Sequence, residues 1–498
     1  MRKEFERVTP ESVGIRSQDI LAYLDELEAS NTEMHALIIM RHGRICAEGS
    51  WSPYALNMRH SLQSHSKTYA ATALGVAVTR GAVRLDERVI DIFPEYAPAE
   101  PSENLRLLTV RDVLCMGCGM DCEPPRSENW IRDFLHTPVS HRPGTAYMYN
   151  STGSSLLGAI VKKRTGDNIE EYLSKYFYPQ AGIDPANHRW YCMPDGIQAG
   201  GFGMLSTIED NLRLMKVYAD GGLCGGERVL DAEYVRLATS NQNDSASEAA
   251  GNPEATDNHV GYGFQIWMCK PRGVYRADGA MGQFTIVCPE QDLIIAITET
   301  AVGAHWAQST LDITWRLLGK IREDGPMPDT ADTDRLALRM KTLSVPKLPC
   351  KPNSSLLPAL RERKYRVAGG YLTPYFYNTL LMSTPPEGIR EFFLEPDDYG
   401  LRWQIRYDSG REECILLPTC GTWATQLLGR SEDNLRACAA SAYWAEDRGL
   451  EAELKWTESC FTKKLRFVFS DEGLEIEDRS MKPVVAKAPD TYVQIELI

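Results

Sequence analysis

The sequence lacks the features that mark membrane-spanning or exported chains. No apolar run approaches the roughly 18 residues that a transmembrane helix needs, and residues 1–15 hold no apolar core of the kind found in secretory signals. Basic residues are outnumbered by acidic ones: the chain has 54 Lys and Arg and 68 Asp and Glu, which gives a net charge of −14. This charge argues against nucleic acid or an anionic membrane as a partner. With 13 cysteines, an odd number, we expect reduced thiols and a cytoplasmic protein.

Several chemical signatures are missing as well. The sequence has no G-x-S-x-G nucleophile elbow, and its glycines around 277–283 lack the strand–GxGxxG–helix context of a dinucleotide site. Cys115 and Cys118, with Cys122 nearby, could begin a zinc site, but no second C-x-x-C or His pair follows. Free thiols in a loop are the favoured interpretation, and we expect neither a metal nor another cofactor.

The most informative positive feature is the stretch Ser64-His65-Ser66-Lys67, at the start of a predicted helix that Gly81 would close. Residues at i and i+3 share a helical face, so the Lys67 amine can lie beside the Ser64 hydroxyl. A serine needs a neighbouring base to become a nucleophile, and a partly desolvated lysine can act as one. His65 is expected to point away from that hydroxyl and to serve packing or line the cleft.

A second S-x-x-K match, Ser344 to Lys347, is a poor candidate. Pro346 lies inside it and opposes a helix, and the surrounding prolines are typical of a linker.

The length of 498 residues predicts two or three domains. Residues 1–322 are expected to form an α+β unit in which an antiparallel sheet is closed by elements from both ends. The expected elements are a hairpin over 36–47, the Ser64 helix, a helix opened by a capping box at Ser206–Glu209, strands at 263–267, 284–287 and 293–298, and a helix over 313–318.

Residues 323–356, rich in proline, are expected to be a linker. Beyond it, apolar and polar residues alternate over 450–456 and 464–469, which is typical of half-buried strands. We therefore expect a separate all-β domain over 357–498, a barrel or a sandwich, with no catalytic residues that the sequence reveals.

Residues of about 8 to 320 resemble the serine β-lactamase and penicillin-binding-protein superfamily, in particular the class C β-lactamase-like esterase branch. The motif 64–67 stands at the S-x-x-K of that family, 143–158 is similar to its PGT-x-F-x-Y-x-N-x-G-x-x-LLG block, and 201–210 is similar to its helix-opening segment. Residues 262–264 and 279–284 match its last segments, in the family's order. The fold implied is a β-lactamase/transpeptidase-like one.

The resemblance implies roles for individual residues. Ser64 would attack an acyl carbonyl, and Lys67 and Tyr149 would share the general acid–base work. The backbone N–H groups of Ser64 and Ala280 would bind the oxyanion. For use near neutrality we expect the pKa of Tyr149 to be lowered by a protonated Lys67, and the pKa of Lys67 to be lowered by burial.

The expected substrate pocket is formed by Ser151, Asp278 and Gly279, and two positions in or beside it depart from the family pattern. Ser151 replaces an asparagine that would contact a substrate amide. Ala277 replaces the lysine or histidine that would pair with a substrate carboxylate, and the carboxylate of Asp278 is expected to repel one. These changes favour neutral substrates over penicillins.

The leading hypothesis is a serine hydrolase that cleaves a small ester or amide through an acyl-enzyme on Ser64. The alternatives are an acyltransferase that uses the same acyl-enzyme, a β-lactamase or D-aminopeptidase, and a catalytically idle binding protein of the same fold. The sequence leaves open the acyl and leaving groups, the oligomeric state and the role of the all-β domain.

Overall fold

The computed structural model of the chain describes residues 4–301, 307–322, 325–376, 386–430, 435–471, 473–480 and 493–498. The chain forms two compact units. Unit 1 comprises Met1–Trp51 and Ala55–Leu343, and unit 2 comprises Ser52–Tyr54 and Ser344–Ile498.

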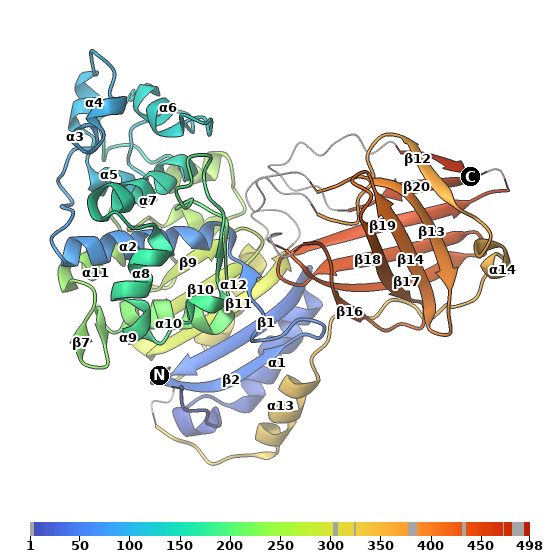
Figure 1. Cartoon of the computed structure of the whole chain (residues 1–498). Helices are drawn as coiled ribbons and strands as arrows, with labels where there is room; N and C mark the ends of the chain where they lie inside the picture. The colour runs from blue at the N-terminus through green and yellow to red at the C-terminus, as the bar shows by residue number, and fades with distance from the viewer. Residues whose placement is uncertain are drawn as a thin grey trace. The chain divides into compact units, whose positions relative to one another are not determined.

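Unit 1 is built around a six-stranded sheet with the order β2-β1-β11-β10-β9-β8 (Figure 1). Each strand in this sheet runs antiparallel to its neighbours. Its strands are β1 (Thr32–Arg41), β2 (Arg44–Ser50), β8 (Trp267–Met268), β9 (Tyr275–Gly279), β10 (Gln283–Cys288) and β11 (Leu293–Ala301). Ile39 on β1 lies opposite Ile295 on β11, so the two ends of the unit meet in the middle of the sheet. The prediction of an α+β fold closed by its terminal strands is confirmed.

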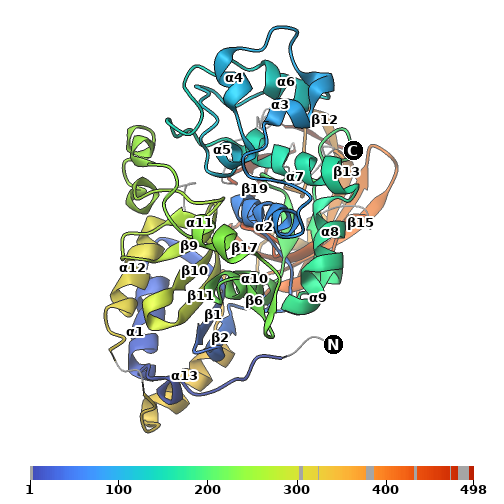
Figure 2. The same ribbon diagram turned by 90° about the vertical axis from the view of Figure 1, so that its left-hand side faces the viewer.

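Helices cover both faces of this sheet (Figure 2). Helix α10 (Ile208–Ala219) lies against β1, β10 and β11, while α1 (Ser17–Ala29), with α12 (Gln308–Leu318) beside it, lies on the other face. Beyond α10, helices α2 (Ser66–Thr79) and α7 (Ser151–Thr165) pack against each other. The other helices are α3 (Val89–Ile92), α4 (Glu103–Leu107), α5 (Val110–Leu114), α6 (Trp130–His136), α8 (Ile169–Tyr176), α9 (Tyr178–Ala181) and α11 (Ala232–Ala238).

Two small sheets complete the unit. One joins β3 (His60–Ser61), β5 (Met204–Ser206) and β4 (Arg189–Trp190), and the other joins β6 (Leu223–Cys224) to β7 (Glu227–Arg228). Because β3 ends two residues before Gln63, its pairing with β5 fixes the chain that leads into Ser64.

The structure corrects the expected linker over 323–356. Residues Ala331–Thr342 form helix α13, which packs against α1 and β2 and belongs to unit 1. Leu336 and Met340 are buried on its inner face. The sequence prediction missed this helix because nearby prolines outweighed its short amphipathic stretch and its Thr330 cap.

Two smaller predictions were also wrong in detail. The cap of α10 is Thr207, whose hydroxyl accepts from the Asp210 amide, rather than the Ser206–Glu209 box. Of the residues in the expected strand over 263–267, only Trp267 belongs to a strand, β8. The φ of 57° at Gln265 is incompatible with a strand and interrupts the expected one.

Unit 2 consists of two antiparallel five-stranded sheets, as the alternating sequence predicted. The first has the order β15-β14-β13-β12-β21 and the second the order β16-β17-β18-β19-β20. Their strands are β12 (Tyr365–Gly369), β13 (Ile389–Pro396), β14 (Gly400–Tyr407), β15 (Glu412–Pro418), β16 (Ala424–Leu427), β17 (Ala437–Glu446), β18 (Gly449–Trp456), β19 (Phe461–Phe469), β20 (Leu474–Asp478) and β21 (Gln494–Leu497). Between the sheets, Trp403 of β14 meets Phe467 of β19 with ring centroids 5.5 Å apart. Helix α14 (Leu357–Leu360) precedes β12.

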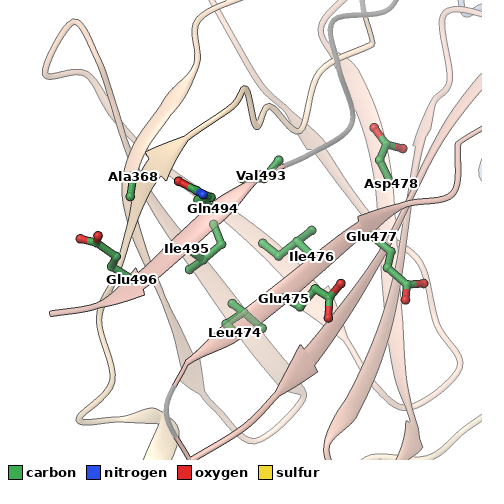
Figure 3. Close-up of a pocket in the computed structure, with 10 residues that line it drawn as sticks. All are labelled: Ala368, Leu474, Glu475, Ile476, Glu477, Asp478, Val493, Gln494, Ile495 and Glu496. Atoms are coloured by element: carbon green, nitrogen blue, oxygen red, sulfur yellow. The ribbon is translucent and has the colours of Figure 1, made fainter.

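A pocket of about 620 Å³ lies in unit 2 between β20, β21 and β12 (Figure 3). It is lined by acidic side chains such as Glu475, Glu477 and Glu496, with Ile476 and Ile495 between them. None of the residues predicted to be catalytic lines it.

Candidate active site

Ser64 lies in a 3-10 turn, Gln63–His65, that leads directly into α2. The predicted helix therefore begins two residues later than expected, but Lys67 still lies in its first turn. The contact predicted from the spacing is present, with Lys67 Nζ 3.1 Å from Ser64 Oγ. Gln63 has a φ of 52°, a left-handed conformation that costs a residue with a side chain some stability and turns the chain sharply before Ser64.

The Lys67 side chain is buried and surrounded by three oxygen atoms. Besides Ser64 Oγ, its Nζ lies 3.1 Å from Ser151 Oγ and 2.6 Å from the Gly201 carbonyl oxygen. Burial, with a smaller contribution from the charge of Arg126, lowers the pKa of Lys67 to about 7, although the carboxylates of Glu123 and Asp278 oppose the shift. The predicted lowering of this pKa agrees with the structure.

This geometry suits a lysine that changes its protonation state. A charged amine can donate to all three oxygens. A neutral amine keeps two N–H groups, which can stay on Ser151 Oγ and Gly201 O, and its lone pair then faces the Ser64 hydroxyl. A lysine held in this way can accept the Ser64 proton without changing its position.

Tyr149 lies beside the same pair, just before the Asn150 cap of α7. Its ring stacks on Trp267 with centroids 5.8 Å apart, and Lys67 Nζ is 4.7 Å from its centroid. Burial raises the pKa of Tyr149, and a hydrogen bond with Ser64 opposes this only in part. The expectation of a lowered tyrosine pKa was therefore wrong, since the loss of solvation outweighs the nearby lysine.

The end of β9 meets the Ser64 turn closely. A Cβ atom on Gly279 would lie 2.1 Å from the Leu62 carbonyl oxygen and 3.2 Å from the His65 nitrogen, so this position accepts only glycine. Ala280 follows directly and comes before a tight turn in which Met281 and Gly282 both have positive φ. Within the described part of the chain, neither the Ser64 amide nor the Ala280 amide donates a hydrogen bond to a backbone oxygen in a turn, loop or cap.

The residues predicted to line the substrate pocket differ in their contacts. Ser151 Oγ bonds Lys67, so it contributes to orienting the lysine rather than only facing a substrate. Asp278 is not an isolated charge: Arg276 Nε lies 2.7 Å from its Oδ2. The expected repulsion of carboxylates is thus weakened by a buried partner that sequence patterns did not indicate. Arg276 is itself fixed by the Met268 carbonyl and by Asn258, so it cannot swing toward Ser64.

The beta-lactamase family pattern matches residues 27–315, which is more than half of the chain. This chain belongs to the beta-lactamase family. Unit 1 accordingly has the beta-lactamase/transpeptidase-like arrangement of helices around an antiparallel sheet.

Individual family members are distant. A 6-aminohexanoate-dimer hydrolase of Paenarthrobacter ureafaciens is 24% identical over 310 residues, which cover 58% of this chain and 78% of that protein. Penicillin-binding protein 4 of Amycolatopsis lactamdurans is 28% identical over 210 residues, covering 35% of this chain and 54% of that protein. A solved octameric penicillin-binding protein homologue from Pyrococcus abyssi is 15% identical, with a TM-score of 0.48 and coverage of 93% and 98% of the two chains.

Three contributors to the beta-lactamase-family site could not be found from the sequence. The Gly201 carbonyl carries no residue-type signal, although Gly201 is the first residue of the family-like segment 201–210. Trp267 and Arg276 lie near the matched segments, but neither the stacking on Tyr149 nor the ion pair with Asp278 follows from spacing. His65 is buried away from solvent, and burial lowers its pKa to about 3, so it is a packing residue as expected.

The described residues hold no group of three His, Cys, Asp or Glu side chains arranged to bind a metal ion, the Cys115–Cys122 segment included. Over the same residues, no helix is both long and apolar enough to cross a membrane.

Proposed function

We propose that this beta-lactamase-family chain is a serine hydrolase that cleaves a small ester or amide through an acyl-enzyme on Ser64. The observation that carries the proposal is the buried Lys67 Nζ, 3.1 Å from Ser64 Oγ, with its pKa lowered to about 7. A serine paired with such a base is an activated nucleophile at neutral pH.

In the proposed reaction, neutral Lys67 takes the Ser64 proton as Oγ forms a bond to the substrate carbonyl carbon. The Ser64 and Ala280 amides hold the oxyanion. As the bond to the leaving group breaks, the protonated Tyr149 donates its proton to the leaving atom and recovers one from Lys67. Water then attacks the acyl carbon and gives a proton to Tyr149 while Tyr149 passes its own proton to Lys67. Lys67 returns a proton to Ser64 Oγ as the bond from Oγ to the acyl carbon breaks, which releases the acid.

The choice of a small ester or amide has two supports. Ala277 on β9 supplies no cation for a carboxylate next to the scissile bond, and Arg276 is held elsewhere by its own contacts. A relative matching 58% of this chain bears the name 6-aminohexanoate-dimer hydrolase. The missing cation favours a non-lactam substrate over a penicillin, and the relative's name supports an amide as one such substrate.

A fluorophosphonate probe tests the nucleophile directly. Mass spectrometry should find one adduct, on the peptide that contains Ser64, and Ser64→Ala should abolish both the adduct and the turnover of p-nitrophenyl esters. Ser344→Ala, in the second S-x-x-K match, is the matched control and should react normally. An adduct that persists in Ser64→Ala would contradict the proposal.

Tyr149→Phe separates the acid from the nucleophile. Removing the hydroxyl keeps the ring stacked on Trp267, so folding should be unaffected while kcat falls by about 10² to 10⁴. The loss should be smaller for p-nitrophenyl esters, whose leaving group needs little protonation, than for amides.

A further inference from the structure

Asp278 lies within the proposed catalytic site although it makes no bond to Ser64. The next residue, Gly279, packs against Leu62 and His65, on either side of the nucleophile turn. On the other side, the Arg276 guanidinium that holds Asp278 lies 5.6 Å from the Trp267 ring centroid, and Trp267 stacks on Tyr149. Two separate sets of contacts therefore place this carboxylate beside the reacting groups.

Only one of the two Asp278 oxygens is occupied. Oδ2 accepts from Arg276 Nε, whereas Oδ1 receives no hydrogen bond from the described residues, and the side chain is 19% exposed. Arg276 cannot release the carboxylate, because it is wholly buried and also bonds the Met268 carbonyl and Asn258. The result is a carboxylate that is fixed in place and presents one oxygen without a hydrogen bond from the described residues.

The charges that act on the site are mostly negative, because three carboxylates oppose the positive charge of Arg126. The carboxylates of Asp278, Glu248 and Glu123 all raise the pKa of Tyr149, so their charges reach the centre of the site. Asn252 holds Glu248 by a hydrogen bond of 2.9 Å, and the described residues offer Glu248 no ion-pair partner. Tyr147, whose ring centroid lies 6.0 Å from that of Trp267, has a buried hydroxyl with no hydrogen-bond partner in the described structure.

We propose that Asp278 Oδ1 is the acceptor for a protonated amine on the substrate, so that the preferred substrates are esters or amides that carry an ammonium group. This inference rests on the proposed function and specifies its substrate class. Ala277 and Asp278 together replace a carboxylate-binding site by an ammonium-binding one. Asp278 is then a specificity residue and takes no part in the chemical step.

The test compares p-nitrophenyl esters whose acyl chains, of two to six carbons, end in an ammonium, methyl or carboxylate group. At the best chain length, kcat/KM for the ammonium ester should exceed that for the methyl ester by about five- to tenfold, with the carboxylate ester slowest. Asp278→Asn, which keeps an oxygen for Arg276, should bring the ammonium-to-methyl ratio close to one. Glu290→Gln, at the far end of β10, is the matched control and should leave the ratio unchanged.

Salt dependence provides a readout that does not need Asp278→Asn, and direct binding provides one that needs neither Asp278→Asn nor turnover. The ratio for the unmodified protein should fall as sodium chloride rises, because screening weakens a charge contact that solvent reaches. In the Ser64→Ala protein, 1-aminohexane should bind more tightly than 1-hexanol by calorimetry. This binding comparison decides the subsite even if no ester is hydrolysed, an outcome that would refute the proposed function separately.

Equal ratios in the unmodified protein and Asp278→Asn, or a preference for the methyl or carboxylate ester, would overturn the inference. Thermal melting checks that Asp278→Asn is folded. If it is not, equal binding of 1-aminohexane and 1-hexanol refutes the subsite, and tighter amine binding that weakens with salt supports it.

Discussion

Lys67 Nζ lies closer to the Gly201 carbonyl oxygen, at 2.6 Å, than to the Ser64 hydroxyl oxygen, at 3.1 Å. The carbonyl accepts a hydrogen bond from either protonation state of the amine. It can therefore hold the nitrogen in place while the proton shared with Ser64 moves.

A general base must be unprotonated, so the pH dependence follows the lysine. We expect kcat/KM for a neutral ester to rise with pH and to level off above a midpoint of about 7, the pKa of Lys67. Lys67→Arg should remove the activity at every pH, because a guanidinium stays protonated. Rates measured from pH 5 to 9 check both points; a rate that does not change between pH 6 and 8 would exclude Lys67 as the titrating base.

Ser151→Ala tests whether this side chain orients the lysine. Loss of the Ser151 acceptor destabilises the charged amine, so the midpoint of the pH profile should move below 7 while kcat falls by about tenfold or more. Thr165→Ala, at the other end of α7, is the control and should change neither quantity. An unchanged midpoint with a raised KM would instead assign Ser151 to substrate binding.

Gly279→Ala tests the close approach of β9 to the Ser64 turn. The added Cβ would lie 2.1 Å from the Leu62 carbonyl oxygen, so the strand end must move away. We expect kcat/KM to fall by more than about 10²-fold, with a loss of about 1–3 kcal/mol in the free energy of unfolding. Gly251→Ala has no atom within 4 Å of the new Cβ and should be neutral. Denaturant unfolding and ester turnover of the two variants decide the matter, and normal activity in Gly279→Ala would refute the contact.

Helix α13 offers a stability test of the revised boundary of unit 1. Leu336 is 3% exposed, so Leu336→Ala should lower the free energy of unfolding by about 2–4 kcal/mol. Leu338, two residues away, is 65% exposed, and Leu338→Ala should change the free energy of unfolding by less than about 0.5 kcal/mol. Similar losses in both variants would show that the helix does not pack as described.

Strands β1, β2, β10 and β11 of unit 1 could be predicted because they are apolar runs bounded by turn residues, and β18 and β19 of unit 2 because burial on one face imposes a period of two on the sequence. The pairing of Ser64 with Lys67 was likewise predictable, since it depends on one turn of helix. Contacts between segments that are distant in the sequence could not be predicted. Gly201 lies 134 positions after Lys67, and no property of a glycine indicates that its carbonyl will accept a lysine.

Charge was the least predictable property of the site. Asp278 was expected to act as a free carboxylate, but strand β9 places Arg276 on the same side two residues earlier, where the side chains of alternate residues meet. The pKa of Tyr149 moved against expectation for a similar reason, because the sequence does not reveal how fully the aromatic residues around the ring exclude water.

Unit 2 is not a continuous stretch of chain, because it includes the tripeptide Ser52–Tyr54 that follows β2. The Val345 amide donates to the Ser52 carbonyl oxygen, and Ser52 pairs with Ser344 in a parallel bridge. During synthesis this tripeptide leaves the ribosome almost 300 residues before its partners do. A gene cut after Leu343 would therefore divide one structural unit into two products, and exchanging the all-β domain between relatives would require transplanting two separate segments.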